Sequence, residues 1–116
     1  MIFDPAPYAE GIVRENEREL ARIRARLEKA RPEAERLSRA IKSADPAVRR
    51  VFLFGSVTKG DAAREGFDLD LAMDGGDLYK ALDIVEDSEF EVDLVRLDLV
   101  PECLRKSIHA TGIELA

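Results

Sequence analysis

The sequence predicts one α/β or α+β domain that follows a long N-terminal helix, and two observations support this prediction. Between residues 8 and 43, apolar residues recur every three or four positions, which is the spacing of an amphipathic helix. After residue 45, short apolar strand patterns alternate with short helical patterns. A chain of 116 residues has room for one modest core. We therefore divide the chain into a helical extension, residues 1–44, and a domain, residues 45–116.

The N-terminal helix is predicted from one apolar stripe with a period of 3.5 residues. Its members are Val13, Leu20, Ile23, Leu27, Ala30, Ala34, Leu37 and Ile41. The stripe either packs on its own domain or also offers a surface to a second copy or a partner, because a sustained 3.5-residue period is typical of helix–helix interfaces. Pro32 removes one helical hydrogen bond and clashes with the preceding turn. We therefore expect two helices, or one kinked helix, with the break near residues 30–32.

The domain is predicted to contain a few short strands and helices, which we take in chain order. The Asp45-Pro46 pair marks a turn, because a residue before proline avoids the helical region. The segment 57–63 is predicted as a loop that leads into or around a short helix. Asp77 is placed to cap a helix whose buried face is Leu78, Ala81, Leu82 and Val85. A last helix is expected from near Pro101 to Gly112. The predicted strands are 50–54, 67–73, 89–97 and 113–115.

Charge is unevenly distributed along the chain, whose formal net charge is −6. Residues 8–43 carry ten Lys/Arg and seven Asp/Glu, whereas residues 51–116 carry six and fifteen. An acidic domain binds phosphate backbones poorly, so we expect no direct nucleic-acid binding, and a nucleotide would need metal cations. No apolar run approaches the roughly 20 residues of a membrane span. A single cysteine, Cys103, fits a reducing, cytoplasmic compartment.

Acidic residues interrupt two of the predicted strands. Asp68 and Asp70 are two residues apart and share one face, while Leu69 and Leu71 face a core. Asp93 joins them if its strand lies beside theirs. Three gathered carboxylates repel one another, and a divalent cation, usually Mg²⁺ when phosphates take part, removes that penalty. The alternative interpretation is a solvated sheet face with ordinary amphipathic alternation.

A Gly-Ser pair follows the first predicted strand. Gly55 and Ser56 offer backbone N–H groups and a hydroxyl without a bulky side chain, which is a common way to hold phosphate. Gly60 adds flexibility and Lys59 a positive charge. The alternative is a plain strand-to-helix turn.

Together, "LFGSVTKG" and "FDLDLAM" resemble the signature of the DNA polymerase β-type nucleotidyltransferase superfamily: Gly-Ser, a gap, Asp-x-Asp, and a third Asp one strand later. The resemblance covers about residues 45–116. In its small size the chain is most similar to the minimal nucleotidyltransferases, as in HEPN/MNT toxin–antitoxin pairs. The resemblance implies a small mixed β-sheet flanked by helices, with residues 45–116 as the nucleotidyltransferase domain.

The resemblance also implies roles for individual residues. Gly55 and Ser56 would hold the β- and γ-phosphates of ATP, and Lys59 would neutralise the departing pyrophosphate. Asp68 and Asp70 would bind two Mg²⁺ ions. Asp93 would complete the second metal site and help activate the acceptor hydroxyl.

Two features depart from the usual family pattern. Relatives usually have Ser or Thr where this chain has Phe67, and we hypothesise that the phenylalanine crowds the nucleotide or deprives it of a hydroxyl contact. The interval from Ser56 to Asp68 is also one residue longer than the commonest form. Neither departure removes a metal ligand.

Three functions remain open from the sequence. The first is a Mg²⁺-dependent enzyme that moves AMP from ATP to a hydroxyl of a partner protein, by resemblance the antitoxin of a HEPN-type ribonuclease toxin. The second is a binding module that neutralises its partner by contact, and the third is a nucleotidyltransferase for a small molecule. His109, the single histidine, is predicted as a helix surface residue, and Cys103 as a small core residue.

Overall fold

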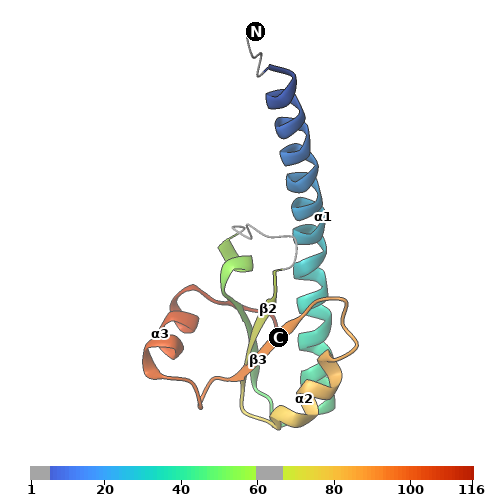
Figure 1. Ribbon diagram of the computed structural model, residues 1–116. Helices are drawn as coiled ribbons and strands as arrows, with labels where there is room; N and C mark the ends of the chain where they lie inside the picture. Colours follow the sequence, from blue (N-terminus) through green and yellow to red (C-terminus); the bar gives the residue numbers. More distant parts are fainter. Residues whose placement is uncertain (1–5, 60–66) are drawn as a thin grey trace.

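The computed structural model describes residues 6–59 and 67–116, and for residues 6–15, 56 and 59 it describes the backbone only. In chain order the elements are α1 (Ala6–Ala44), β1 (Arg50–Phe54), the 3₁₀ helix η1 (Ser56–Lys59), β2 (Leu69–Asp74), α2 (Leu78–Val85), β3 (Val92–Arg96), α3 (Glu102–Thr111) and β4 (Ile113–Glu114). Figure 1 shows the sheet with α1 and α2 on one side and α3 away from them. No helix in the described residues is long and apolar enough to cross a membrane.

The four strands form one mixed sheet in the order β3-β2-β1-β4. β2 pairs antiparallel with β1 and parallel with β3, and β4 pairs antiparallel with β1. The α+β prediction with a small mixed sheet is therefore confirmed. Two strands begin later than the sequence pattern indicates, β2 at Leu69 and β3 at Val92. In front of β3, the Phe90 N–H donates to Ser88 Oγ, which holds this segment in a turn.

Each face of the sheet packs against different helices. Val51, Leu53, Leu71 and Met73 point to one face and form the main core with Ala34, Leu37 and Ile41 of α1 and with α2. On the other face, a smaller cluster joins Phe52, Ala72 and Leu97 to Ile108 of α3. The two faces follow from strand alternation, in which successive side chains point to opposite sides.

Helix α1 is continuous from Ala6 to Ala44 and contains Pro32 in its interior. The expectation of two separate helices is therefore wrong. Pro32 lies on the exposed side of the helix, while Ala30 and Ala34 on either side of it are fully buried. Burial of this stripe offsets the one backbone hydrogen bond that proline cannot make. The N-terminal half of α1 extends beyond the sheet (Figure 1).

The predicted capping and turn positions are confirmed. Asp77 accepts hydrogen bonds from the N–H groups of Tyr79 (3.0 Å) and Lys80 (3.5 Å) at the start of α2. Asp45 accepts from the N–H groups of Ala47 (3.0 Å) and Asp77 (2.8 Å), and these bonds lower the pKa of its carboxyl. One carboxylate thus ties the end of α1 to the start of α2.

Two apolar assignments were wrong. Leu82, expected on the buried face of α2, is 39% exposed. Cys103, expected as a small core residue, is exposed in the first turn of α3. Leu82 follows the buried Ala81, and Cys103 precedes the half-buried Leu104. In a short helix, the apolar residues alone do not show which of two neighbouring positions faces the core. His109 is on the helix surface as predicted, with its ring edge against Phe52 at a centroid distance of 5.7 Å.

Candidate functional site

The three predicted carboxylates come from two neighbouring strands. Asp70 of β2 and Asp93 of β3 are direct partners in the parallel register. Asp68 immediately precedes β2 and, by strand alternation, shares the face of Asp70. Asp70 of β2 pairs with Phe54 of β1, and Phe54 packs against the smaller cluster. The carboxylates therefore lie on the face of the sheet that α3 covers. The side-by-side placement of Asp93 and the Asp68/Asp70 pair, which the sequence left conditional, is present in the structure.

The electrostatics of this face appear most clearly at Asp70. Burial raises the pKa of the Asp70 carboxyl to about 6, and the nearby charges of Asp93 and then Asp68 add to the effect. Asp68 and Asp93 are themselves exposed. The arrangement therefore concentrates negative charge around a half-buried carboxylate, which is the condition that a bound cation relieves.

The carboxylates do not form a closed ligand set in this conformation. Within residues 6–59 and 67–116, no three His, Cys, Asp or Glu side chains are grouped so as to hold a metal ion. Asp68 and Asp93 are exposed, so both side chains have room to rotate toward Asp70. Carboxylate oxygens are the donors that Mg²⁺ prefers, so the donor chemistry of the three aspartates fits such an ion.

Gly55 brings the turn after β1 against Asp70. Its φ of +83° is in the region that favours glycine, and a Cβ built on it would overlap Asp70 Oδ2. Two independent constraints, backbone conformation and close approach, therefore require glycine here. The turn at Gly55, where the predicted phosphate-binding segment begins, therefore lies against Asp70.

Thr58 is a residue that the motif did not identify. Its Oγ1 donates to the Gly55 carbonyl oxygen at 2.7 Å, and its N–H donates to the same oxygen at 3.2 Å. These two bonds fix the turn that opens η1. A threonine hydroxyl that donates to the backbone carbonyl three residues earlier is a common local bond, and the Gly55-to-Thr58 spacing is the sequence signal that could have found it.

Ser56 and Lys59 lie on η1, and their side chains are outside the described residues. The expected phosphate contact and pyrophosphate neutralisation therefore stay predictions. The same holds for Gly60 and for the extra residue in the interval before Asp68, which falls in residues 60–66.

Phe67 points away from the carboxylates. Its side chain is 7% exposed and belongs to the main core, with its ring centroid 5.9 Å from that of Phe90. The Arg26 guanidinium lies over both rings, 5.6 Å from Phe67 and 4.4 Å from Phe90. This placement argues against the hypothesis that Phe67 crowds a nucleotide, and explains the residue as part of the packing that joins α1 to the sheet.

Comparison with known proteins gives a family match and a set of similar folds. Residues 34–113 match the family model described as nucleotidyltransferase domain. No curated protein matches the chain. The match begins inside α1, at the part of the helix that packs in the main core. The division of the chain at residue 44 stays a prediction.

Three solved structures share the fold. A structure described as "Crystal structure of the toxin-antitoxin with AMP-PNP" has 22% sequence identity and a TM-score of 0.59, over 71% of this chain and 72% of that chain. A MntA-HpeT toxin–antitoxin structure, a mutant in which two aspartates two residues apart are replaced by glutamate, has 19% identity and a TM-score of 0.58, over 71% of each chain. A MntA-HepT toxin–antitoxin structure has 19% identity and a TM-score of 0.51, over 77% of this chain and 71% of that chain.

Proposed function

The chain belongs to the nucleotidyltransferase domain family, and from this premise we propose that it transfers AMP from ATP to a hydroxyl group of a partner protein, as the antitoxin of a HEPN-type ribonuclease toxin. The observation that carries the proposal is the register of β2 and β3, which places Asp93 beside Asp70 next to the Gly55 turn. The solvated-face alternative accounts for neither the glycine packed on Asp70 nor the raised pKa of that carboxyl.

The proposed reaction is an in-line displacement at the α-phosphorus of ATP. An oxygen of the acceptor hydroxyl bonds to the α-phosphorus, the bond from that phosphorus to the bridging oxygen of the β-phosphate breaks, and pyrophosphate leaves. Asp93, an exposed strand carboxylate beside Asp70, takes the hydroxyl proton. The Gly55 turn and Ser56 hold the β- and γ-phosphates, and Lys59 balances the charge of the leaving group.

Asp68 and Asp70 are the proposed ligands of two Mg²⁺ ions, with Asp93 as a further ligand of the second. Such ions would neutralise the carboxylates and lower the pKa of the acceptor hydroxyl. The protein's own contribution is to place Asp70 and Asp93 on adjacent strands and to keep Asp70 half-buried beside Gly55.

The toxin partner is supported by the fold comparisons. All three neighbours are described as toxin–antitoxin structures, one of them with the ATP analogue AMP-PNP. Another carries changes at two aspartates with the same two-residue spacing as Asp68 and Asp70. These descriptions favour a protein acceptor over a small-molecule acceptor.

The proposal is tested by incubating the chain with ATP labelled at the α-phosphate, Mg²⁺ and a HEPN-type toxin. Label should appear on the toxin, and the Asp68→Asn/Asp70→Asn variant should transfer none. The matched control is Asp87→Asn, an exposed aspartate outside the site that should leave transfer unchanged. Label that never reaches the toxin would contradict the proposal.

A second candidate is a module that neutralises the toxin by contact alone. Residues 16–22 of α1 favour it, because each of them is exposed and none belongs to the main core. A contact-only antitoxin keeps its effect on the toxin when both aspartates are replaced. An enzyme loses it.

A further inference from the structure

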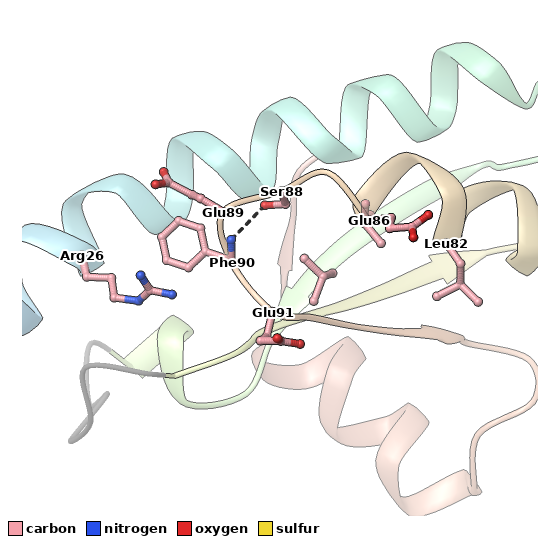
Figure 2. A pocket seen from close by; sticks show the side chains of 9 residues that line it. Arg26, Leu82, Glu86, Ser88, Glu89, Phe90 and Glu91 are labelled. Carbon is pink, nitrogen blue, oxygen red and sulfur yellow. Dashed lines mark hydrogen bonds between the residues drawn. The ribbon is translucent and has the colours of Figure 1, made fainter.

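A cavity outside the carboxylate site opens between α1, α2 and the segment that leads into β3. Its volume is about 410 Å³, and its apolar wall includes Leu82, Val85 and Phe90. Figure 2 shows Leu82 on α2, Glu86 directly after α2, Arg26 on α1, and Phe90 and Glu91 in the segment before β3. We refer to this cavity as the α2 groove.

Apolar side chains on the outer side of α2 lie next to the groove without cover from the described chain. Leu82, which lines the groove, is 39% exposed, and Tyr79, one turn earlier on the same side of the helix, is 80% exposed. Adjoining exposed apolar side chains beside a concave surface are typical of an interaction site.

The charge around the groove specifies the kind of occupant. Residues 78–92 contain five Asp/Glu and one Lys, a net of −4. Glu86, Glu89 and Glu91 line the groove itself, and Arg26 offsets only one of these charges. A fitting occupant therefore combines an apolar side chain with positive charge.

Residues 16–25 of α1 have that chemistry. Leu20 is 54% exposed, although it belongs to the same stripe as the buried Ile23. Residues 16–25 carry three Arg and two Glu, and Arg26, which lines the groove of its own copy, is not among them. Leu20 and Arg24 are four residues apart on α1. Leu82 of α2 and Glu86, which directly follows α2, have the same spacing, so an apolar and a charged side chain on each surface can meet their counterparts.

We infer that two copies of this chain associate reciprocally, with residues 16–25 of α1 from each copy docked in the α2 groove of the other. Each copy carries one helix to donate and one groove to accept it, so a two-fold axis satisfies both surfaces at once and closes the assembly as a dimer. Neither surface includes the carboxylates. The inference therefore stands apart from the proposed chemistry, and a failure of either leaves the other intact.

The test is sedimentation velocity of the full chain over a wide range of concentration. The monomer has a mass of 13.0 kDa, and a species of twice that mass should form as the concentration rises. Leu20→Asp and Leu82→Asp should each weaken this association at least tenfold. Leu99→Asp is the matched control, because Leu99 is 70% exposed but lies outside the groove, and it should not change the association. Circular dichroism confirms that each variant is folded.

Mixing the variants distinguishes this arrangement from a simple pairing of two α1 helices. The Leu20→Asp copy keeps its groove and the Leu82→Asp copy keeps its helix, so an equal mixture should regain one of the two contacts and associate more strongly than either variant alone. The double variant should regain nothing. A chain that is monomeric at every concentration, or a dimer that tolerates Leu82→Asp, overturns the inference. A monomer would instead leave the groove to a different basic protein.

Discussion

Asp70 shows how the candidate site opposes the stability of its own fold. The carboxylate is half-buried beside two other acids, and its pKa is raised from 3.8 to about 6. The folded state therefore binds the proton more tightly than the unfolded state does. It follows that this group lowers the free energy of unfolding as pH rises from about 4 to about 6, and that the loss is complete above that range.

We predict that Asp70→Asn stabilises the metal-free protein near neutral pH. The expected gain in the free energy of unfolding is about 1 kcal/mol, less than the full pKa shift implies, because solvent screens the exposed part of the carboxylate. Urea unfolding at several pH values measures it. The gain should disappear below the ordinary carboxyl pKa of 3.8. A variant that is less stable than the wild type at neutral pH would contradict this account of Asp70.

Gly55 leads to a second prediction at the level of one residue. Gly55→Ala places a Cβ on Asp70 Oδ2 and holds a non-glycine residue at a φ of +83°. We expect a loss of roughly 1–3 kcal/mol in the free energy of unfolding, together with loss of ATP binding. Denaturant unfolding and a binding titration measure the two effects. In the Asp70→Gly background, which removes the overlap but not the backbone strain, the stability loss should be smaller. Equal losses in both backgrounds would show that the overlap contributes nothing.

The sequence predicted the carboxylates because alternation in a strand fixes which residues share a face. It could not predict that Gly55 packs on Asp70, because that contact depends on the pairing of Phe54 with Asp70 across β1 and β2. The same limit explains Phe67. Its departure from the family pattern was visible in the sequence, but its direction into the core was settled only by the packing of Arg26 and Phe90 around it.

At the scale of elements, α1 contains a polar group that its packing does not satisfy. Ser38 is fully buried, and its Oγ has no hydrogen-bond partner among the described residues. Burying an unpaired hydroxyl is unfavourable, and serine also has a lower helix propensity than alanine.

We therefore predict that Ser38→Ala raises the free energy of unfolding by about 1 kcal/mol. Thermal and urea unfolding measure the change. Ser43→Ala, at an exposed position of the same helix, is the matched control and should gain less, because only the helix propensity changes there. If Ser38→Ala is destabilising instead, the hydroxyl has a partner that this packing does not show.

Helix α1 also shows where local sequence rules are overridden. Pro32 is a sound reason to expect a break, and the helix nevertheless continues because four stripe positions, Ala30, Ala34, Leu37 and Ile41, are fully buried against the sheet. The start of β3 differs from prediction for a similar reason, since Ser88 donates to Glu33 (2.7 Å) and accepts from the Phe90 N–H, which holds residues 88–90 in a turn. Neither contact can be inferred from local periodicity.

At the scale of the molecule, the chain has an elongated shape, 71 × 30 × 18 Å, because half of α1 extends past a small domain. The domain needs the buried part of α1 to complete its main core. We predict that removing residues 1–19 leaves cooperative unfolding in place, because Ile23 is the first buried residue among the described side chains of α1. Removing residues 1–44 should abolish it, since Ala34, Leu37 and Ile41 belong to the main core.

Circular dichroism and urea unfolding of the two truncations measure this directly. The result also tests the division of the chain at residue 44. A cooperatively folded 45–116 fragment would show that the extension and the domain are independent units, whereas an unfolded fragment would assign the second half of α1 to the domain.

The central claim, that three aspartates beside the Gly55 turn form a metal-dependent nucleotide site, is tested most directly by calorimetric titration of ATP into the chain with Mg²⁺ and with EDTA. The account predicts binding with Mg²⁺, none with EDTA, none for Asp68→Asn/Asp70→Asn, and unchanged binding for Asp87→Asn. ATP binding should also weaken as pH falls through about 6, because protons then compete with the metal for the Asp70 carboxylate. ATP binding that is indifferent to the metal and to both aspartates would contradict the claim.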